Sequence, residues 1–151
     1  MISDTDWMSL ALEQAQLAAD LDEVPVGAVV VCQGRPISMA HNLRQNDGDP
    51  VAHAEILAIQ AAARHLGDWR LIDTVLYVTL EPCPMCAGAI LLARIPRLVY
   101  AAADPKSGAV ESLYNLLSDH RLNHQTEVTA GILREESRDL LQSFFRKKRR
   151  R

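Results

Sequence analysis

Two apolar runs limit what this chain can fold into more than any other feature. Residues 26–32 form a continuous apolar segment rich in valine, and residues 74–80 form a second run of apolar and β-branched side chains. Runs of this length and composition predict strands that are buried in the middle of a sheet. A sheet with buried strands needs helices on both of its faces. The rest of the sequence should therefore supply two layers of helices.

The remaining segments alternate between helical and strand patterns. An opening helix, capped by Asp4 or Thr5, carries apolar residues at helical spacing through Leu17 and Ala18 and ends before Val24. Further helices are expected at 51–65, 84–94, 110–117 and 132–149, further strands at 36–41, 97–102 and 126–129, and a loop at 42–50. This order predicts an α/β fold, a three-layer α/β/α sandwich with a five-stranded mixed sheet. We expect antiparallel pairing at the opening hairpin and parallel pairing after it.

Length and charge describe one acidic domain with a basic end. A chain of 151 residues is typical of a single domain, here 1–151, and is long enough to build its core without a structural metal. The net charge is −3, but all six residues of 146–151 are basic. Because only ten of the sixteen basic residues precede them, against all nineteen acidic ones, residues 1–145 carry a net charge of −9. Such an asymmetry favours a polyanionic partner.

Cysteine use and the first residues indicate a cytoplasmic protein. The three cysteines, Cys32, Cys83 and Cys86, are an odd number, and the last two form a Cys-x-x-Cys pair. The first 25 residues contain acidic side chains and no Lys or Arg, unlike a signal peptide. The apolar runs are too short to cross a membrane. Cys32, inside a valine-rich strand, is interpreted as a small core residue rather than a ligand.

Two short motifs carry the predicted chemistry, and each stands where a helix begins. They are His53-Ala-Glu55 and Pro82-Cys83-Pro-Met-Cys86. Two cysteines three residues apart lie on one helix face, and a helix N-terminus favours their thiolate forms. With His53 they make three metal ligands, which leaves one position of a tetrahedral zinc ion open, as in catalytic sites. Glu55 is then the predicted proton carrier, since His-x-Glu followed by Pro-Cys-x-x-Cys is the zinc deaminase signature.

Taken with this signature, other segments give the chain a close resemblance to the bacterial tRNA-specific adenosine deaminases of the cytidine/deoxycytidylate deaminase-like superfamily. The matching segments are 23–28 (EVPVGA), Asn42, 71–73 (LID), 76–80 (LYVTL), 87–89 (AGA), 104–109 (DPKSGA), 123–124 (NH), 131–133 (GIL) and 144–146 (FFR). The resemblance implies a cytidine deaminase-like fold and hydrolytic deamination of the wobble adenosine in a tRNA anticodon, typically of an arginine tRNA. It also implies a homodimer with one zinc ion per subunit and an anticodon stem-loop as its partner.

The same resemblance implies roles for individual residues. His53, Cys83 and Cys86 would bind zinc, Glu55 would move protons, and Asn42 would hydrogen-bond the flipped-out nucleoside. Val24, Pro25 and Ala54 would form the wall of the nucleoside pocket. The residues implied to contact the flanking nucleotides are Asp104, Lys106, Ser107, Asn123, Phe145 and Arg149. The resemblance implies nothing about Arg150 and Arg151, because the basic run itself is not a constant of the family.

Two other functions fit parts of the same pattern. A free-base or nucleoside deaminase, for guanine or cytosine, would share both motifs but would have no use for the basic end, because its substrate is small and uncharged. A nucleic-acid-binding module with structural zinc would use the cysteines but not Glu55. For the basic residues themselves, the alternative is a solvated helix end that only keeps the protein soluble.

Overall fold

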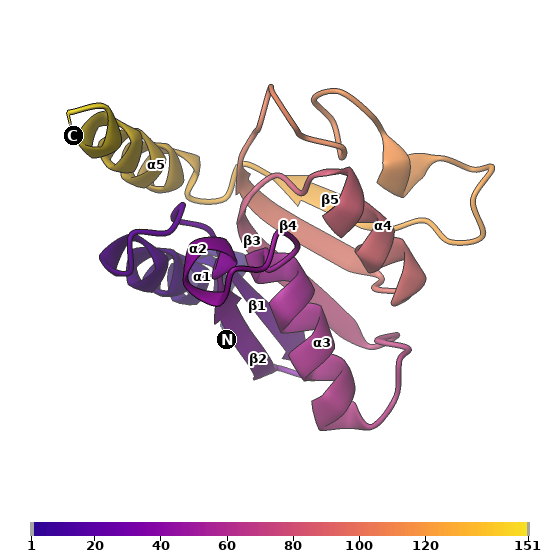
Figure 1. The fold of residues 1–151 in the computed structure, drawn as a ribbon. Helices are drawn as coiled ribbons and strands as arrows, with labels where there is room; N and C mark the ends of the chain where they lie inside the picture. Colours follow the sequence, from indigo (N-terminus) through magenta and orange to yellow (C-terminus); the bar gives the residue numbers. More distant parts are fainter. Residues whose placement is uncertain (1, 151) are drawn as a thin grey trace.

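The fold is an α/β sandwich around one five-stranded sheet (Figure 1). The computed structural model describes residues 2–150. The elements in chain order are α1 (Asp4–Asp20), β1 (Gly27–Cys32), β2 (Arg35–His41), α2 (Arg44–Asp47), α3 (Ala54–Leu66), β3 (Thr74–Leu80), α4 (Pro84–Leu92), β4 (Arg97–Ala102), the 3-10 helix η1 (Leu116–Ser118), β5 (Glu127–Ala130) and α5 (Arg134–Arg149). The predicted fold class is confirmed, and all five predicted strands exist.

The sheet has the strand order β2-β1-β3-β4-β5. As predicted, β1 pairs antiparallel with β2, and the pairs β3–β4 and β4–β5 are parallel. The expectation of parallel pairing throughout the rest of the sheet is wrong at one place, because β3 pairs antiparallel with β1. The crossover through α3 carries the chain past β1, so that β3 runs parallel to β2 while lying on the other side of β1.

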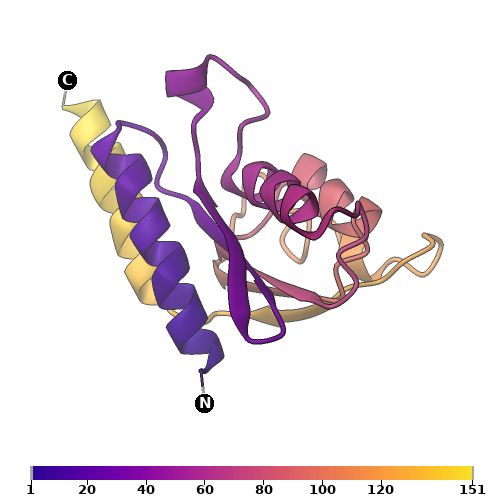
Figure 2. The same cartoon turned by 90° about the horizontal axis from the view of Figure 1, so that it is seen from below.

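Helices cover both faces of the sheet, as the two buried runs require. Figure 2 shows α1 and α5 side by side on one face, with α3 and α4 on the other. Alternate side chains of β1 serve the two layers: Ala28 and Val30 belong to the core with α3 and α4, and Val29 and Val31 to the core with α1. This period of two is the pleat of a strand.

The helix α1 lies unusually close to the sheet. A Cβ atom on Gly27 would come within 2.0 Å of the Ala11 carbonyl oxygen, so only glycine fits at this crossing. The predicted cap is corrected: Ser3, rather than Asp4 or Thr5, caps the helix, in a capping box with Asp6. Leu17, expected on the apolar face, is 47% exposed, because the buried face is centred on alanines that allow the close approach.

Two segments differ from their predicted structure. The expected loop at 42–50 contains the short helix α2, because Glu23 accepts hydrogen bonds from the first N–H groups there. The expected helix at 110–117 is wrong, since only the single turn η1 forms at its end. The N–H groups of Val110, Glu111 and Ser112 instead converge on the carboxylate of Glu81 and shape this segment as turns.

The closing helix α5 is amphipathic but only lightly buried. It begins at Arg134 rather than at residue 132, because Leu133 adopts a left-handed conformation with φ of 57°. The apolar spacing of 132–149 predicts both Phe144 and Phe145 on the buried side of this helix. Phe144 is buried, but Phe145 is 44% exposed. Among residues 2–150, neither α5 nor any other helix has the length and apolar character to cross a membrane. Arg151 lies outside the described residues.

Candidate active site

Four segments of the chain come together at one edge of the sheet. The register pairs His41, at the end of β2, with Gly27, at the start of β1. It also places the end of β3 beside the start of β1 and beside the end of β4. Asn42, the Val24–Val26 stretch, the Cys83 segment and the chain after Ala102 are therefore neighbours. The carboxyl ends of parallel strands are the usual place for a ligand crevice in such folds.

The three predicted metal ligands meet at this edge. Nδ1 of His53 lies 3.7 Å from Sγ of Cys83 and 3.5 Å from Sγ of Cys86, and the ligand atoms all lie within 4.8 Å of one another. Within residues 2–150 this is the one group of three or more potential ligands close enough to share a cation, and the half-buried Cys32 is not part of it. One imidazole and two thiolates are a donor set that zinc prefers, so the residues fit the ion.

The helix positions explain why these side chains can act as ligands. His53 is the N-cap of α3 and Cys83 that of α4, with Cys86 in the first turn. Hydrogen bonds from Cys86 and His53 lower the pKa of Cys83 from 9.0 to about 4, against the effect of burial. The same contact raises the pKa of Cys86, since a second negative charge beside the Cys83 thiolate is unfavourable. The two sulfur atoms therefore share one proton, and binding of a divalent cation would displace that proton.

Glu55 is buried beside this cluster. It lies in the first turn of α3, lines the cavity and is only 4% exposed. Burial raises the pKa of Glu55 from 4.5 to about 7, although the positive charge of His53 acts in the opposite direction. A carboxyl group that titrates near neutral pH can both accept and donate a proton there. The site can therefore support general acid–base chemistry.

Asn42 connects the two sides of the site. Its Oδ1 accepts a hydrogen bond of 2.8 Å from the backbone N–H of Ala54, the residue between His53 and Glu55. Within the described chain, the side-chain amide nitrogen has no protein partner, and the residue lines the cavity. The oxygen thus holds the start of α3, and the NH2 group is the atom that can donate to a ligand.

A cavity of about 800 Å³ joins these groups to the closing helix. Its lining contains His53, Glu55 and Cys83 together with seven of the predicted substrate contacts, namely Asn42, Val24, Asp104, Lys106, Ser107, Phe145 and Arg149. Phe145, which the resemblance placed among the nucleotide contacts, is 44% exposed and belongs to this lining. The structure therefore gathers most of the predicted site residues around one cavity, while their roles toward a substrate stay predictions.

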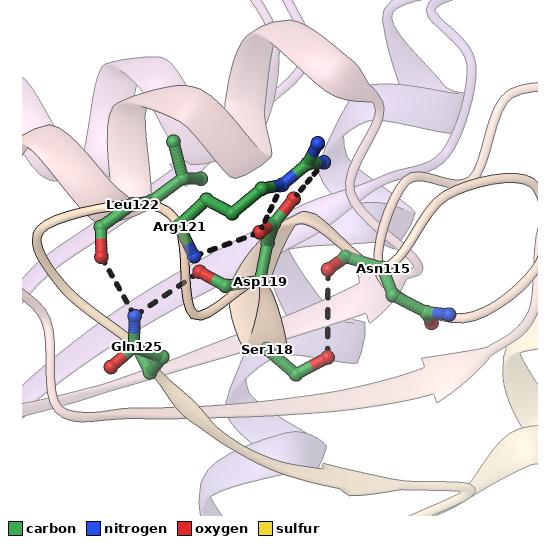
Figure 3. Close-up of polar contacts among 6 residues, drawn as sticks. All are labelled: Asn115, Ser118, Asp119, Arg121, Leu122 and Gln125. Carbon is green, nitrogen blue, oxygen red and sulfur yellow. Dashed lines mark hydrogen bonds and ion pairs between the residues drawn. The ribbon is translucent and has the colours of Figure 1, made fainter.

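Three predicted substrate residues are not in the lining. Pro25 is buried between Val24 and Val26, which both line the cavity, and Ala54 is fully buried between His53 and Glu55, which do so too. Asn123 lies in the turn at 119–125, which Figures 1 and 2 place far from α5. Figure 3 shows that this turn is held by its own contacts: Arg121 pairs with Asp119, and Gln125 donates to two backbone carbonyl groups.

Several lining residues have no counterpart among the predicted ones. Leu141 and Lys148 belong to the face of α5 that also carries Phe145, and the helical spacing of 141, 145 and 148 could have revealed them. Arg44 follows Asn42 by two residues and gave no separate signal. Glu81 directly precedes the Pro82-Cys83 motif, but nothing in the motif indicates that its partners lie 23 to 31 residues later.

Comparison with known proteins places the chain in a class and then in a family. Residues 2–149 match the family described as MafB19-like deaminase, so the fold and the ligand cluster belong to a deaminase. A tRNA-specific adenosine deaminase from Bacillus subtilis (strain 168) is 49% identical over 150 residues, which cover 99% of this chain and 93% of the relative. The chain belongs to the tRNA-specific adenosine deaminase family.

Two solved structures sharpen the comparison. One, from a study of A-to-I editing by tRNA:A34 deaminases at the wobble position of transfer RNA, has a TM-score of 0.87 and 48% identity, covering 91% of this chain and 99% of the other. A guanine deaminase from Nitrosomonas europaea has a TM-score of 0.84 but only 25% identity, covering 95% and 85%. The free-base alternative thus shares the fold, whereas the sequence lies with the tRNA enzymes.

Proposed function

We propose that this protein converts the wobble adenosine of a tRNA anticodon, in an arginine tRNA, to inosine, with release of ammonia. The observation that carries the proposal is the continuity of the cavity, which is lined by Glu55 and two of the three ligands, His53 and Cys83, and also by Lys148 and Arg149 of α5. A free base would leave the basic residues without a partner, whereas the phosphates of an RNA loop suit them. The family relationship supports the same substrate.

His53, Cys83 and Cys86 are the residues that would hold a zinc ion. Bound there, zinc supplies a Lewis acid that lowers the pKa of a water molecule towards about 7. Glu55 takes a proton from the attacking water and delivers it to the ring nitrogen beside the reacting carbon. It then carries the second proton, from the hydroxyl group added to that carbon, to the amine, which leaves as ammonia. The overall reaction consumes one water and releases one ammonia for each adenosine.

Other residues of the cavity bind and orient the nucleoside. The amide NH2 of Asn42 donates to the substrate, because its oxygen is already engaged with Ala54. Val24 forms part of the apolar wall. An anticodon loop suits such a site, since its unpaired bases cost little to turn out of the stack. The contacts of Asp104, Lys106, Ser107, Asn123, Phe145 and Arg149 with flanking nucleotides belong to the same proposal.

We further propose a cytoplasmic homodimer with one zinc ion per subunit. Large apolar side chains are exposed at Leu92, which is 72% exposed, Leu113 and Tyr114. A second copy of the chain could bury such side chains in a dimer interface. Light scattering of the purified protein tests the dimer, and a monomer at micromolar concentration would contradict it. Metal analysis tests the ion.

The deciding experiment compares substrates. The protein is incubated with an anticodon stem-loop that carries adenosine at the wobble position and, separately, with guanine, cytosine and cytidine. We expect inosine at the wobble position and no turnover of the small molecules. Deamination of the small molecules alone would establish the free-base alternative. Tight metal without turnover of any substrate would favour a structural zinc module.

A further inference from the structure

The segment between β4 and η1 needs an external anchor. Residues 103–115 form no helix or strand, yet Asp104, Lys106 and Ser107 of this segment line the cavity. Asp104 organises the first turn, because its Oδ1 accepts the N–H groups of Lys106 and Ser107. These local bonds shape the turn but do not fix its position relative to the cavity. That position must come from contacts with the rest of the fold.

Glu81 supplies these contacts from the junction between β3 and α4. Its Oε1 accepts the N–H of Asp104 at 3.0 Å and the hydroxyl of Ser112. Its Oε2 accepts the N–H groups of Val110, Glu111 and Ser112 at 3.1, 2.8 and 2.9 Å. One carboxylate thus binds both the first and the last part of the segment and closes it into a loop.

The backbone of this loop packs closely against the Glu81 carboxylate. A Cβ atom on Gly108 would come within 2.3 Å of Cδ of Glu81, so the backbone crosses this point only because residue 108 is glycine. A second tie holds the same region, since the Ala109 N–H donates to the Pro82 carbonyl at 2.9 Å. The Asp104–Ser107 turn is therefore anchored on the segment that leads directly to Cys83.

We propose that Glu81 is a positioning residue that sets the Asp104–Ser107 turn against the cavity and thereby determines recognition of the RNA around the reacting base. The inference rests on the proposed function, because it assigns to this loop the nucleotides next to the target. Glu81 is 2% exposed and its oxygens are occupied by five donors, so it acts through the loop rather than on the substrate. The chemical step stays with Glu55.

The sharpest variant is Glu81→Gln. An amide can still accept the three N–H groups at one oxygen, but its NH2 group then opposes the Asp104 N–H, so the loop is released at its first residue. We expect KM for the stem-loop to rise about tenfold, as for the loss of one hydrogen bond to a charged group, with kcat within about threefold of the parent. Zinc content should be unchanged.

Glu111→Gln is the matched control. It neutralises a glutamate of the same loop whose side chain, among residues 2–150, accepts a hydrogen bond only from the Tyr100 hydroxyl, and its backbone donor to Glu81 is kept. We expect KM within about twofold of the parent. Equal KM increases in both variants would show a general effect of charge and would overturn the proposal, as would a fall in kcat at constant KM for Glu81→Gln.

Amide hydrogen exchange separates this inference from the proposed function. Faster exchange confined to residues 104–112 in Glu81→Gln supports the anchoring, and unchanged exchange overturns it, whichever substrate the enzyme uses. If the parent protein did not deaminate the stem-loop, the proposed function would fail while the exchange result still judged the anchor. Should Glu81→Gln not fold, Gly108→Ala, which pushes the loop away from an intact Glu81, replaces it with the same expected outcomes.

Discussion

Two buried glutamates, Glu55 and Glu81, differ in the hydrogen-bond donors around them, and with these in the pKa and the role of the carboxyl group. They are 4% and 2% exposed, and both border the cavity. Burial raises the pKa of Glu55 to about 7. Burial would raise that of Glu81 as well, but four backbone N–H groups and the Ser112 hydroxyl hold the pKa of Glu81 below its ordinary value. Glu55 is the more strongly desolvated of the two and, within the described residues, lacks such a set of donors, so it can exchange protons, whereas Glu81 is a fixed anion that can only hold a loop.

Removing the metal should have the largest effect on the Glu55 side of this comparison. Dialysis against a chelator is expected to abolish turnover and leave the fold intact, because the two apolar cores contain most of the buried side chains. Circular dichroism and stem-loop turnover are measured before and after zinc is restored. Loss of the native spectrum together with the metal would contradict the view that the ion serves chemistry rather than folding.

Replacing Glu55 should come next in size. Glu55→Gln keeps the shape of the side chain and removes its proton exchange, so kcat should fall by roughly 10²–10⁴-fold. Zinc content and melting temperature should stay near those of the parent. Glu81→Gln in the same assay should keep most of kcat. Equal losses of kcat in the two variants would abolish the distinction between the glutamates.

Asn42 allows an intermediate test of the cavity wall. Asn42→Asp keeps an oxygen that can accept from Ala54 and removes the NH2 donor, so the start of α3 should stay in place while substrate affinity falls about tenfold. Asn42→Ala removes both interactions and should also lower the melting temperature. A variant Asn42→Asp with unchanged KM would show that the NH2 group does not contact the nucleoside.

The basic end of α5 should have a smaller effect that depends on salt. Truncation after Phe145 removes Lys148, which pairs with Asp22 at 2.8 Å, and Arg149 of the cavity lining. Fewer phosphate contacts should weaken stem-loop binding severalfold at low salt and flatten its dependence on salt concentration. Arg138→Ala, on an exposed part of the same helix, is the control. An unchanged salt slope would leave the tail with a role in solubility only.

The smallest expected effect concerns pH and a third buried carboxylate, Glu23. Burial acts to raise its pKa, but donors from Asn46 and Gln45 hold the pKa below its ordinary 4.5. Because the folded state has the lower pKa, this stabilisation is present above pH 4.5 and is lost as the pH falls through the folded value. Urea unfolding from pH 7 to pH 3 should show a weaker decline for Glu23→Gln. Parallel curves for both proteins would contradict it.

The local parts of the site could be predicted from the sequence. Cys83 and Cys86 share a helix face because three residues make nearly one turn, and Pro84 at the first helical position marks where α4 begins. The buried strands β3 and β4 followed from their composition and formed at the predicted residues. These features depend on neighbours in the chain, so a single sequence contains the information.

The parts that failed depend on distant partners. The region 110–117 has apolar residues that suit a helix. Its first three N–H groups instead donate to the carboxylate of Glu81, which lies at the end of β3. The apolar pattern of 132–149 predicted Phe145 on the buried side of its helix, but the packing of α5 leaves it 44% exposed in the cavity lining, where the family resemblance had placed it. Neither partner can be found by spacing along the chain.

The sequence by itself determined the layers of the fold, the family resemblance and the chemical types of the ligands, because periodicity and helix starts are local properties. Only the tertiary structure decided that His53 reaches Cys83 and Cys86, that β3 pairs antiparallel with β1, and that Glu55 and Arg149 line one cavity. The tertiary structure also decided that Glu55 and Glu81 differ in pKa and in role. Burial and hydrogen bonding depend on which distant groups pack together, and that packing exists only in the folded chain.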